Sequence, residues 1–145
     1  MNKRSAAVVW ALMWAACNAQ PRDAGGRAAA GEAGSLVLSL EVEVHRDSVR
    51  FSLHATNPTT QEIPLEYGSA QRFDFEVRDA AGATLWRWSA DQAFAQVVGQ
   101  ERVASGATLK YEAVWQPAGR TGRFVVIGRM VSMPDVREQQ TEFEI

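Results

Sequence analysis

Two neighbouring segments decide the fold of this chain: Leu36-Val-Leu-Ser-Leu-Glu-Val-Glu-Val44 and Val49-Arg-Phe-Ser-Leu-His-Ala55. In both, apolar side chains alternate with mostly polar ones, which is typical of half-buried β-strands. The short polar turn His45-Arg-Asp-Ser48 joins them, so we expect an antiparallel hairpin. The predicted register pairs apolar residues on one face and opposite charges on the other: Val44 with Val49, Val42 with Phe51, Leu40 with Leu53, and Glu43 with Arg50.

Several shorter strands are expected downstream of this hairpin. They are separated by turns such as the one at 79–82, and they lie at residues 63–67, 73–77, 84–88, 109–115, 124–131 and 141–145. Pro64 cannot donate a ladder hydrogen bond, which favours a position at a sheet edge. Residues 91–98 form either a short helix or an irregular crossing. Seven or eight short strands without a long helical window predict an all-β fold, a sandwich of two antiparallel sheets.

Length and composition limit the organisation and the partners of the chain. Its 145 residues, 46% of them hydrophobic, suffice for one domain with a buried core, which we place at residues 35–145. The 15 Lys and Arg residues are balanced by 17 Asp and Glu residues, so the sequence lacks the basic character of a nucleic-acid-binding protein. A single cysteine, Cys17, allows no internal disulfide and no Cys-rich metal site. We expect a monomer without a metal or a cofactor.

The first 34 residues have the features of an export signal followed by a linker. A short basic segment precedes an apolar run at residues 5–16, which has the length of a signal-peptide core and is too short to span a membrane. The run ends in Trp14-Ala-Ala-Cys17, which resembles the processing site of bacterial lipoproteins, although Trp14 stands where an aliphatic residue is usual. We expect a signal peptide at 1–16 and a flexible tether at 17–34. Cleavage after Ala19 without lipidation is the alternative.

This interpretation predicts the location of the protein. A lipid on Cys17 would be its one contact with the membrane and would hold it in the cell envelope. With ordinary cleavage, the protein would be exported without an anchor.

The sequence gives little support for catalysis. His45, Asp47 and Ser48 lie in one turn, but neighbouring turn residues seldom adopt the geometry of a catalytic triad, and the chain has no Gly-x-Ser-x-Gly motif. His54 is expected as an exposed residue on the polar face of its strand. We therefore expect a protein that is not an enzyme.

Two pairs of carboxylates are spaced two residues apart on predicted strands. They are Glu41 with Glu43 and Asp74 with Glu76. Such oxygen ligands could bind a hard cation. Because alternating charge is the ordinary composition of a solvated sheet face, we interpret both pairs as surface residues.

Two features are expected to contact another protein. Trp86 and Trp88 are of a type common at interface hot spots, but tryptophan in a sandwich strand also fills the core, where we expect at least one of the two rings. The loop at residues 116–123 is rich in Pro and Gly and displays Arg120 and Arg123. The same loop could also be an ordinary connection.

The middle of the chain contains two distinctive elements in order, Phe73-Asp-Phe75 and Trp86-Arg-Trp88-Ser89. Together with flanking residues they resemble the BsuPI family of intracellular proteinase inhibitors over roughly residues 36–115. The positions that fit the family pattern are Asn57, Gln71, Phe73, Asp74, Phe75, Gly82, Trp86, Trp88, Ser89 and Phe94.

The resemblance implies an immunoglobulin-like β-sandwich and a protein-binding function. The family's named member inhibits a serine protease of the subtilisin type, so we expect a proteinase inhibitor here. An exported chain would need its target protease in the envelope or outside the cell. The alternative is a non-inhibitory domain that binds or assembles with an envelope protein.

Overall fold

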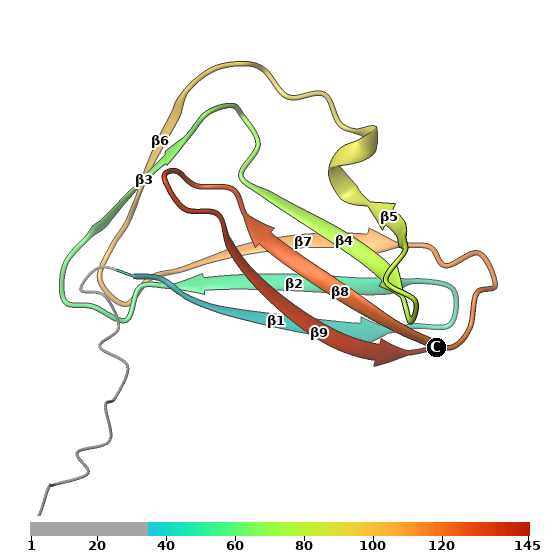
Figure 1. The fold of residues 1–145 in the computed structure, drawn as a ribbon. Helices are drawn as coiled ribbons and strands as arrows, with labels where there is room; N and C mark the ends of the chain where they lie inside the picture. Colours follow the sequence, from blue (N-terminus) through green and yellow to red (C-terminus); the bar gives the residue numbers. More distant parts are fainter. Residues whose placement is uncertain (1–34) are drawn as a thin grey trace, which may run out of the picture.

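The computed structural model describes residues 35–145, so the predicted signal peptide, Cys17 and tether lie outside the described residues. Figure 1 shows strands joined by loops and one short 3-10 helix. The elements are β1 (Val37–Val44), β2 (Val49–Thr56), β3 (Ile63–Tyr67), β4 (Phe73–Asp79), β5 (Thr84–Arg87), η1 (Trp88–Asp91), β6 (Gly99–Val103), β7 (Thr108–Trp115), β8 (Arg123–Met130) and β9 (Arg137–Glu144). All of the strand pairs are antiparallel, which confirms the predicted all-β class.

Two sheets form the body of the molecule. One has the strand order β1-β2-β7 and the other the order β5-β4-β8-β9. Their inner faces bury a continuous apolar core, within which Phe51, Leu53, Phe75, Val77 and Val126 are fully buried. Burial of such side chains stabilises the fold by about 1.5–3 kcal/mol each. The predicted sandwich of antiparallel sheets is confirmed.

The first hairpin has the predicted register. Val44 pairs with Val49, and every other predicted pair from β1 and β2 follows it. Glu43 lies opposite Arg50, but its carboxylate contacts the side chain of His45, at 3.7 Å from Nε2. The apolar alternation therefore fixed the register, and the predicted ion pair was not needed for it.

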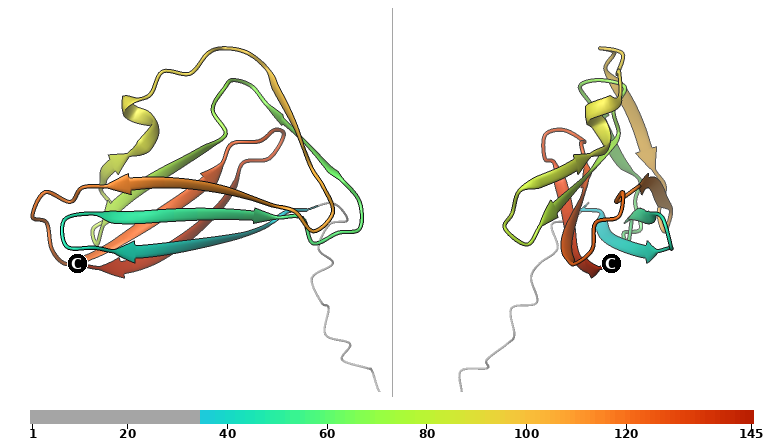
Figure 2. Two further views of the ribbon diagram at one scale, coloured as in Figure 1. Left: turned by 180° about the vertical axis from the view of Figure 1, so that it is seen from behind. Right: turned by 90° about the vertical axis from the view of Figure 1, so that its right-hand side faces the viewer.

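A separate two-stranded ribbon, β3 with β6, extends beyond the sandwich (Figure 2). Pro64 lies opposite Arg102 in this ribbon, which confirms its predicted place on an edge strand. The fully buried Asn57 links the ribbon to the sandwich, because its Nδ2 donates to the main-chain oxygens of Gln61 (2.7 Å) and Val103 (2.9 Å). This explains why an asparagine suits the end of β2.

One strand and two strand boundaries differ from the prediction. Strand β6 was not predicted, because its sequence Gly99-Gln-Glu-Arg-Val103 has little apolar alternation. Strand β5 ends at Arg87, so Trp88 begins η1 instead of ending a strand, and the crossing at 92–98 is irregular. Strand β9 starts at Arg137, four residues before the predicted start at residue 141. In the part of the chain that the structure describes, no helix is long and apolar enough to span a membrane.

Candidate functional site

The predicted contact loop between β7 and β8 is a compact turn. Ala118 and Gly119 both adopt left-handed backbone angles, with φ of 51° and 78°. The main-chain N–H of Arg120 closes the turn by donating to the Pro117 carbonyl oxygen at 3.1 Å. The Arg120 side chain bends back to the same oxygen, at 3.3 Å from Nη1. This loop therefore presents a folded turn and not an extended strand.

Arg123 lies on a different element from Arg120. It is the first residue of β8, and its exposed guanidinium lies 3.9 Å from the Glu144 carboxylate on β9. The strand start is fixed by two hydrogen bonds between the main chains of Gly122 and Ile145, at 2.9 and 3.0 Å. Both predicted arginines are exposed, but they do not act as one pair.

The predicted tryptophans lie against the core. Trp86 packs near Phe51, with ring centroids 6.2 Å apart, and Trp88 stacks on Phe73 at 4.2 Å. Both indoles are half-buried. The expectation that at least one ring joins the core is confirmed, and what either ring offers to a partner is its remaining exposed edge.

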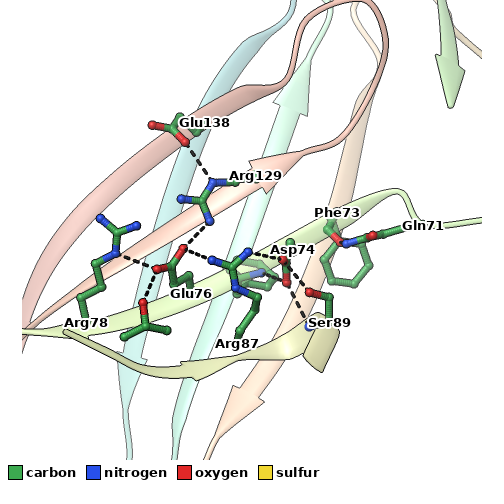
Figure 3. A network of polar contacts seen from close by, with 11 residues as sticks. Gln71, Phe73, Asp74, Glu76, Arg78, Arg87, Ser89, Arg129 and Glu138 are labelled. Atoms are coloured by element: carbon green, nitrogen blue, oxygen red, sulfur yellow. Dashed lines mark hydrogen bonds and ion pairs between the residues drawn. The ribbon is translucent and has the colours of Figure 1, made fainter. Parts of the chain in front are cut away.

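A cluster of family-pattern residues holds η1 against β4. The Asp74 carboxylate accepts hydrogen bonds from the Ser89 hydroxyl (2.7 Å) and from the Ser89 main-chain N–H (3.0 Å), as Figure 3 shows. It also accepts the N–H of Phe75 at 2.9 Å. The Gln71 side chain donates to the main-chain oxygen of Phe73 at 3.1 Å. These hydrogen bonds fix the short helix η1 to β4. Another family-pattern residue, Gly82, has a φ of 85° and takes the left-handed position in the β4–β5 turn.

The prediction that Asp74 and Glu76 are surface residues is wrong. Both point away from the core on the outer face of their sheet, yet Asp74 is 4% exposed and Glu76 is fully buried. Arginine side chains on neighbouring strands cover Glu76. Its carboxylate accepts hydrogen bonds from Arg78 (2.7 Å), Thr84 (2.6 Å), Arg87 (2.8 Å) and Arg129 (2.6 Å). We call Glu76 and these four residues the Glu76 cluster (Figure 3).

The opposite charges of this cluster stabilise one another. Burial alone would raise the pKa of Glu76, but the hydrogen bonds from Arg78, Thr84 and Arg129 outweigh it and lower the pKa to about 2. Burial favours the neutral form of Arg129, but its contacts with Glu76 and Glu138 raise its pKa. The cluster therefore stays ionised and holds β4, β5 and β8 together on the outside of the sheet.

The 92–98 segment between η1 and β6 is a feature that the sequence did not single out. It joins η1 to β6 as the yellow connection that runs outside the loop between β3 and β4 in Figures 1 and 2, and the main-chain N–H of Ala70 in that loop donates to the Ala95 carbonyl oxygen at 2.9 Å. Val97 and Val98 are 63% and 68% exposed, more than any other large apolar residue at positions 35–145. Gln92 begins the segment with extended backbone angles, φ −109° and ψ 147°.

Both ends of this segment are fixed. At the start, the half-buried Phe94 ring lies 5.8 Å from Trp88. At the end, the Arg72 guanidinium stacks on the Tyr67 ring at 4.2 Å and also covers Gly99. A Cβ atom at position 99 would overlap that guanidinium, so only glycine allows this close approach.

The remaining predicted sites are not brought together into a catalytic or metal-binding arrangement. His45 contacts Glu43, and the side chain of His54 is only 23% exposed, with Nε2 3.5 Å from the Glu41 carboxylate. The prediction that His54 is exposed is therefore wrong, because the Glu41 side chain on the neighbouring strand β1 lies against the His54 ring. Among residues 35–145, no group of three or more His, Cys, Asp or Glu side chains is placed to hold a metal ion.

The two packed antiparallel sheets, with their buried aromatic core and loops at either end, define an immunoglobulin-like β-sandwich. Residues 36–134 match the family described as BsuPI, intracellular proteinase inhibitor. Because this match covers more than half of the chain, the protein belongs to the BsuPI family, and the predicted resemblance is confirmed.

Solved structures resemble the chain only distantly. A penta-heme cytochrome c552 from Thermochromatium tepidum aligns at 14% identity over 77% of this chain and 40% of its own, with a TM-score of 0.49. A protein from Archaeoglobus fulgidus aligns at 13% identity over 77% and 98%, with a TM-score of 0.42. A β-glucosidase from Kluyveromyces marxianus aligns at 10% identity over 77% and 14%, with a TM-score of 0.44. No curated protein matches the sequence. Similarity this distant does not indicate a function.

Proposed function

We propose that this protein is an exported, membrane-tethered inhibitor of a serine protease of the cell envelope. Family membership supports the inhibitory class. The observation that carries the proposal is a neutral, largely exposed segment, residues 92–98, held at both ends by a rigid β-sandwich. A protein inhibitor needs such a segment, because it must fill the protease cleft without losing its own conformation on binding.

In this proposal the sandwich supplies the rigidity that small exported inhibitors often obtain from disulfides. The chain has a single cysteine, so the fold depends on packing and on polar networks. Near the start of the segment, Asp74 binds Ser89 and Trp88 stacks on Phe73. Pre-organisation of this kind improves affinity by reducing the ordering cost of association.

The export signal predicted from the sequence, together with Cys17, supports the proposed envelope location. If Cys17 is lipidated, cells grown with a radiolabelled fatty acid should incorporate the label into the protein, and Cys17→Ser should abolish incorporation and release the protein from the membrane fraction. No labelling of the natural chain would favour ordinary cleavage after Ala19, and labelling of the Cys17→Ser variant would show that the lipid is not on Cys17.

Titration against a panel of proteases tests the inhibitory function. The purified full-length protein, in mild detergent, is added to subtilisin-like and trypsin-like serine proteases while hydrolysis of a small substrate is followed. We expect stoichiometric loss of activity for at least one member of the panel. No loss of activity with any protease at micromolar protein would contradict the proposal and favour the non-inhibitory envelope-binding alternative.

A further inference from the structure

We propose that the 92–98 segment is the part of this protein that enters the protease, and that the protease has apolar substrate specificity. This inference rests on the proposed inhibitory function and deepens it. The segment would lie in the substrate cleft as an added strand, in the way that an extended peptide pairs with the edge of a sheet.

The main chain of the segment is available for such pairing. In the part of the chain that the structure describes, the main-chain N–H groups of residues 93–98 donate no hydrogen bond. Two of its carbonyl oxygens accept hydrogen bonds: that of Ala95 accepts the N–H of Ala70 at 2.9 Å, and that of Phe94 accepts the Gln96 side chain at 3.4 Å. Exposed, unpaired donors of this kind are the groups that a cleft recognises without regard to side-chain sequence.

The side chains of the segment select the class of protease. Residues 92–100 read Gln-Ala-Phe-Ala-Gln-Val-Val-Gly-Gln and contain no charged residue. Val97 and Val98 project their side chains into solvent at 63% and 68% exposure, so the segment presents two adjacent apolar groups that an apolar partner surface can cover. A cleft that prefers apolar residues fits this segment, whereas one that requires Lys or Arg finds neither here.

The segment is also fixed at both of its ends, as a segment that inserts into a protease cleft needs to be. It spans from η1, which is fixed to β4 through Asp74 and Ser89, to β6, which pairs with β3 from Gly99 onward. Arg72 locks the second end by stacking on Tyr67 and donating to the Ser69 oxygen at 2.8 Å. Anchors on two different sheets restrict both ends while leaving the middle exposed.

The β7–β8 loop is less suited to the same role. Its residues Ala118, Gly119 and Gly122 have left-handed backbone angles, so the loop cannot lie flat along a cleft without changing conformation. Its arginines would instead suit a trypsin-like protease. The two segments therefore predict different protease specificities, and this difference makes them separable by experiment.

Three forms of the full-length protein test the inference in the inhibition assay. Val97→Asp/Val98→Asp places two charges where an apolar cleft would close, and we expect inhibition of a subtilisin-like protease to weaken at least about 100-fold. Val114→Asp/Val136→Asp changes two valines that are 51% and 58% exposed elsewhere in the chain and serves as the matched control. Arg120→Ala/Arg123→Ala tests the β7–β8 loop. We expect the last two forms to inhibit like the natural protein, and circular dichroism checks that each form is folded.

Hydrogen exchange supplies a second readout. The amides of residues 93–98 should exchange rapidly in the free protein and at least about 10-fold more slowly in the complex, because binding gives them partners. Weakened inhibition by Arg120→Ala/Arg123→Ala, with Val97→Asp/Val98→Asp unchanged, would overturn the inference and leave the inhibitory function standing. Absence of inhibition by the natural protein would instead overturn the proposed function, and this inference with it.

Discussion

Glu76→Gln removes the buried charge on which the outer face of the β5-β4-β8-β9 sheet depends. The Glu76 carboxylate is fully buried and accepts four hydrogen bonds, three of them from arginines. Lowering its pKa from 4.5 to about 2 corresponds to about 3 kcal/mol of stability at neutral pH. Removing one side of a buried charge network costs a similar amount, about 3–5 kcal/mol, and the partly exposed Arg78 and Arg87 can return to water, which favours the lower value.

The stabilisation by Glu76 should decrease as the pH falls. Because the folded pKa of Glu76 lies below its unfolded value, its contribution is fully present above pH 4.5 and is lost as the pH falls from 4.5 toward 2. Urea unfolding of residues 35–145, followed by tryptophan fluorescence, should show a loss of about 3 kcal/mol for Glu76→Gln at pH 7. The difference from the natural sequence should shrink as the pH is lowered through this range.

A matched control uses the other partner of Arg129. Glu138 contacts the same guanidinium at 3.0 Å, but its side chain is 58% exposed, so Glu138→Gln should cost less than about 1 kcal/mol. Equal effects of the two substitutions, or a loss below about 1 kcal/mol for Glu76→Gln, would refute the reasoning that burial makes the Glu76 charge structural.

Three further predictions concern stability and use the same urea assay. Gly99→Ala should cost no more than about 1 kcal/mol, because only the flexible end of the Arg72 side chain must move away from residue 99, and a larger loss would show that the stacking of Arg72 on Tyr67 is structurally important. Asn57→Ala should cost about 2 kcal/mol, since buried main-chain oxygens lose their donor, and a loss under about 0.5 kcal/mol would contradict that role. Arg120→Ala/Arg123→Ala should change the unfolding free energy by less than about 0.5 kcal/mol, because both side chains are exposed, and a larger loss would reveal a structural role.

Periodic apolar patterns correctly predicted the strands that have one apolar and one polar face. Leu40 and Val42 alternate with Glu41 and Glu43 in β1, so a shift of one residue would expose the core face, and only the observed register avoids this. Pro64 likewise predicted an edge strand from its missing donor. In contrast, the polar sequence of β6 carries no such signal, since the ribbon is stabilised by pairing with β3 and by contacts from Asn57.

The burial of Asp74 and Glu76 could not be predicted from strand alternation. A period of two indicates which face a side chain occupies, but not what covers that face. Arg87 and Arg129, which cover Glu76, lie 11 and 53 residues away in the sequence, so only the sheet order brings them together. The grouping of three arginines around one buried carboxylate can be inferred only when the strand order β5-β4-β8 is known.

The 92–98 segment escaped prediction for a different reason. Its sequence has neither a strand alternation nor a helical period, so it resembled a plain connection. The role that we propose for it follows from its anchors, which come from β4, η1 and β6. By comparison, Arg120 and Arg123 were predicted as contact residues because their loop is rich in Pro and Gly. The structure places Arg120 in a folded turn and Arg123 on strand β8.

Complex formation with an active-site-blocked protease tests the central claim most directly. A subtilisin-like protease is used either free or after reaction with a peptidyl chloromethyl ketone that fills its substrate cleft, and each form is mixed with the full-length protein and analysed by sedimentation. We expect a one-to-one complex with the free protease and none with the blocked form, because both ligands need the same cleft. Equal binding to the two forms would contradict insertion into the cleft, and binding to neither would contradict inhibition of this class of protease.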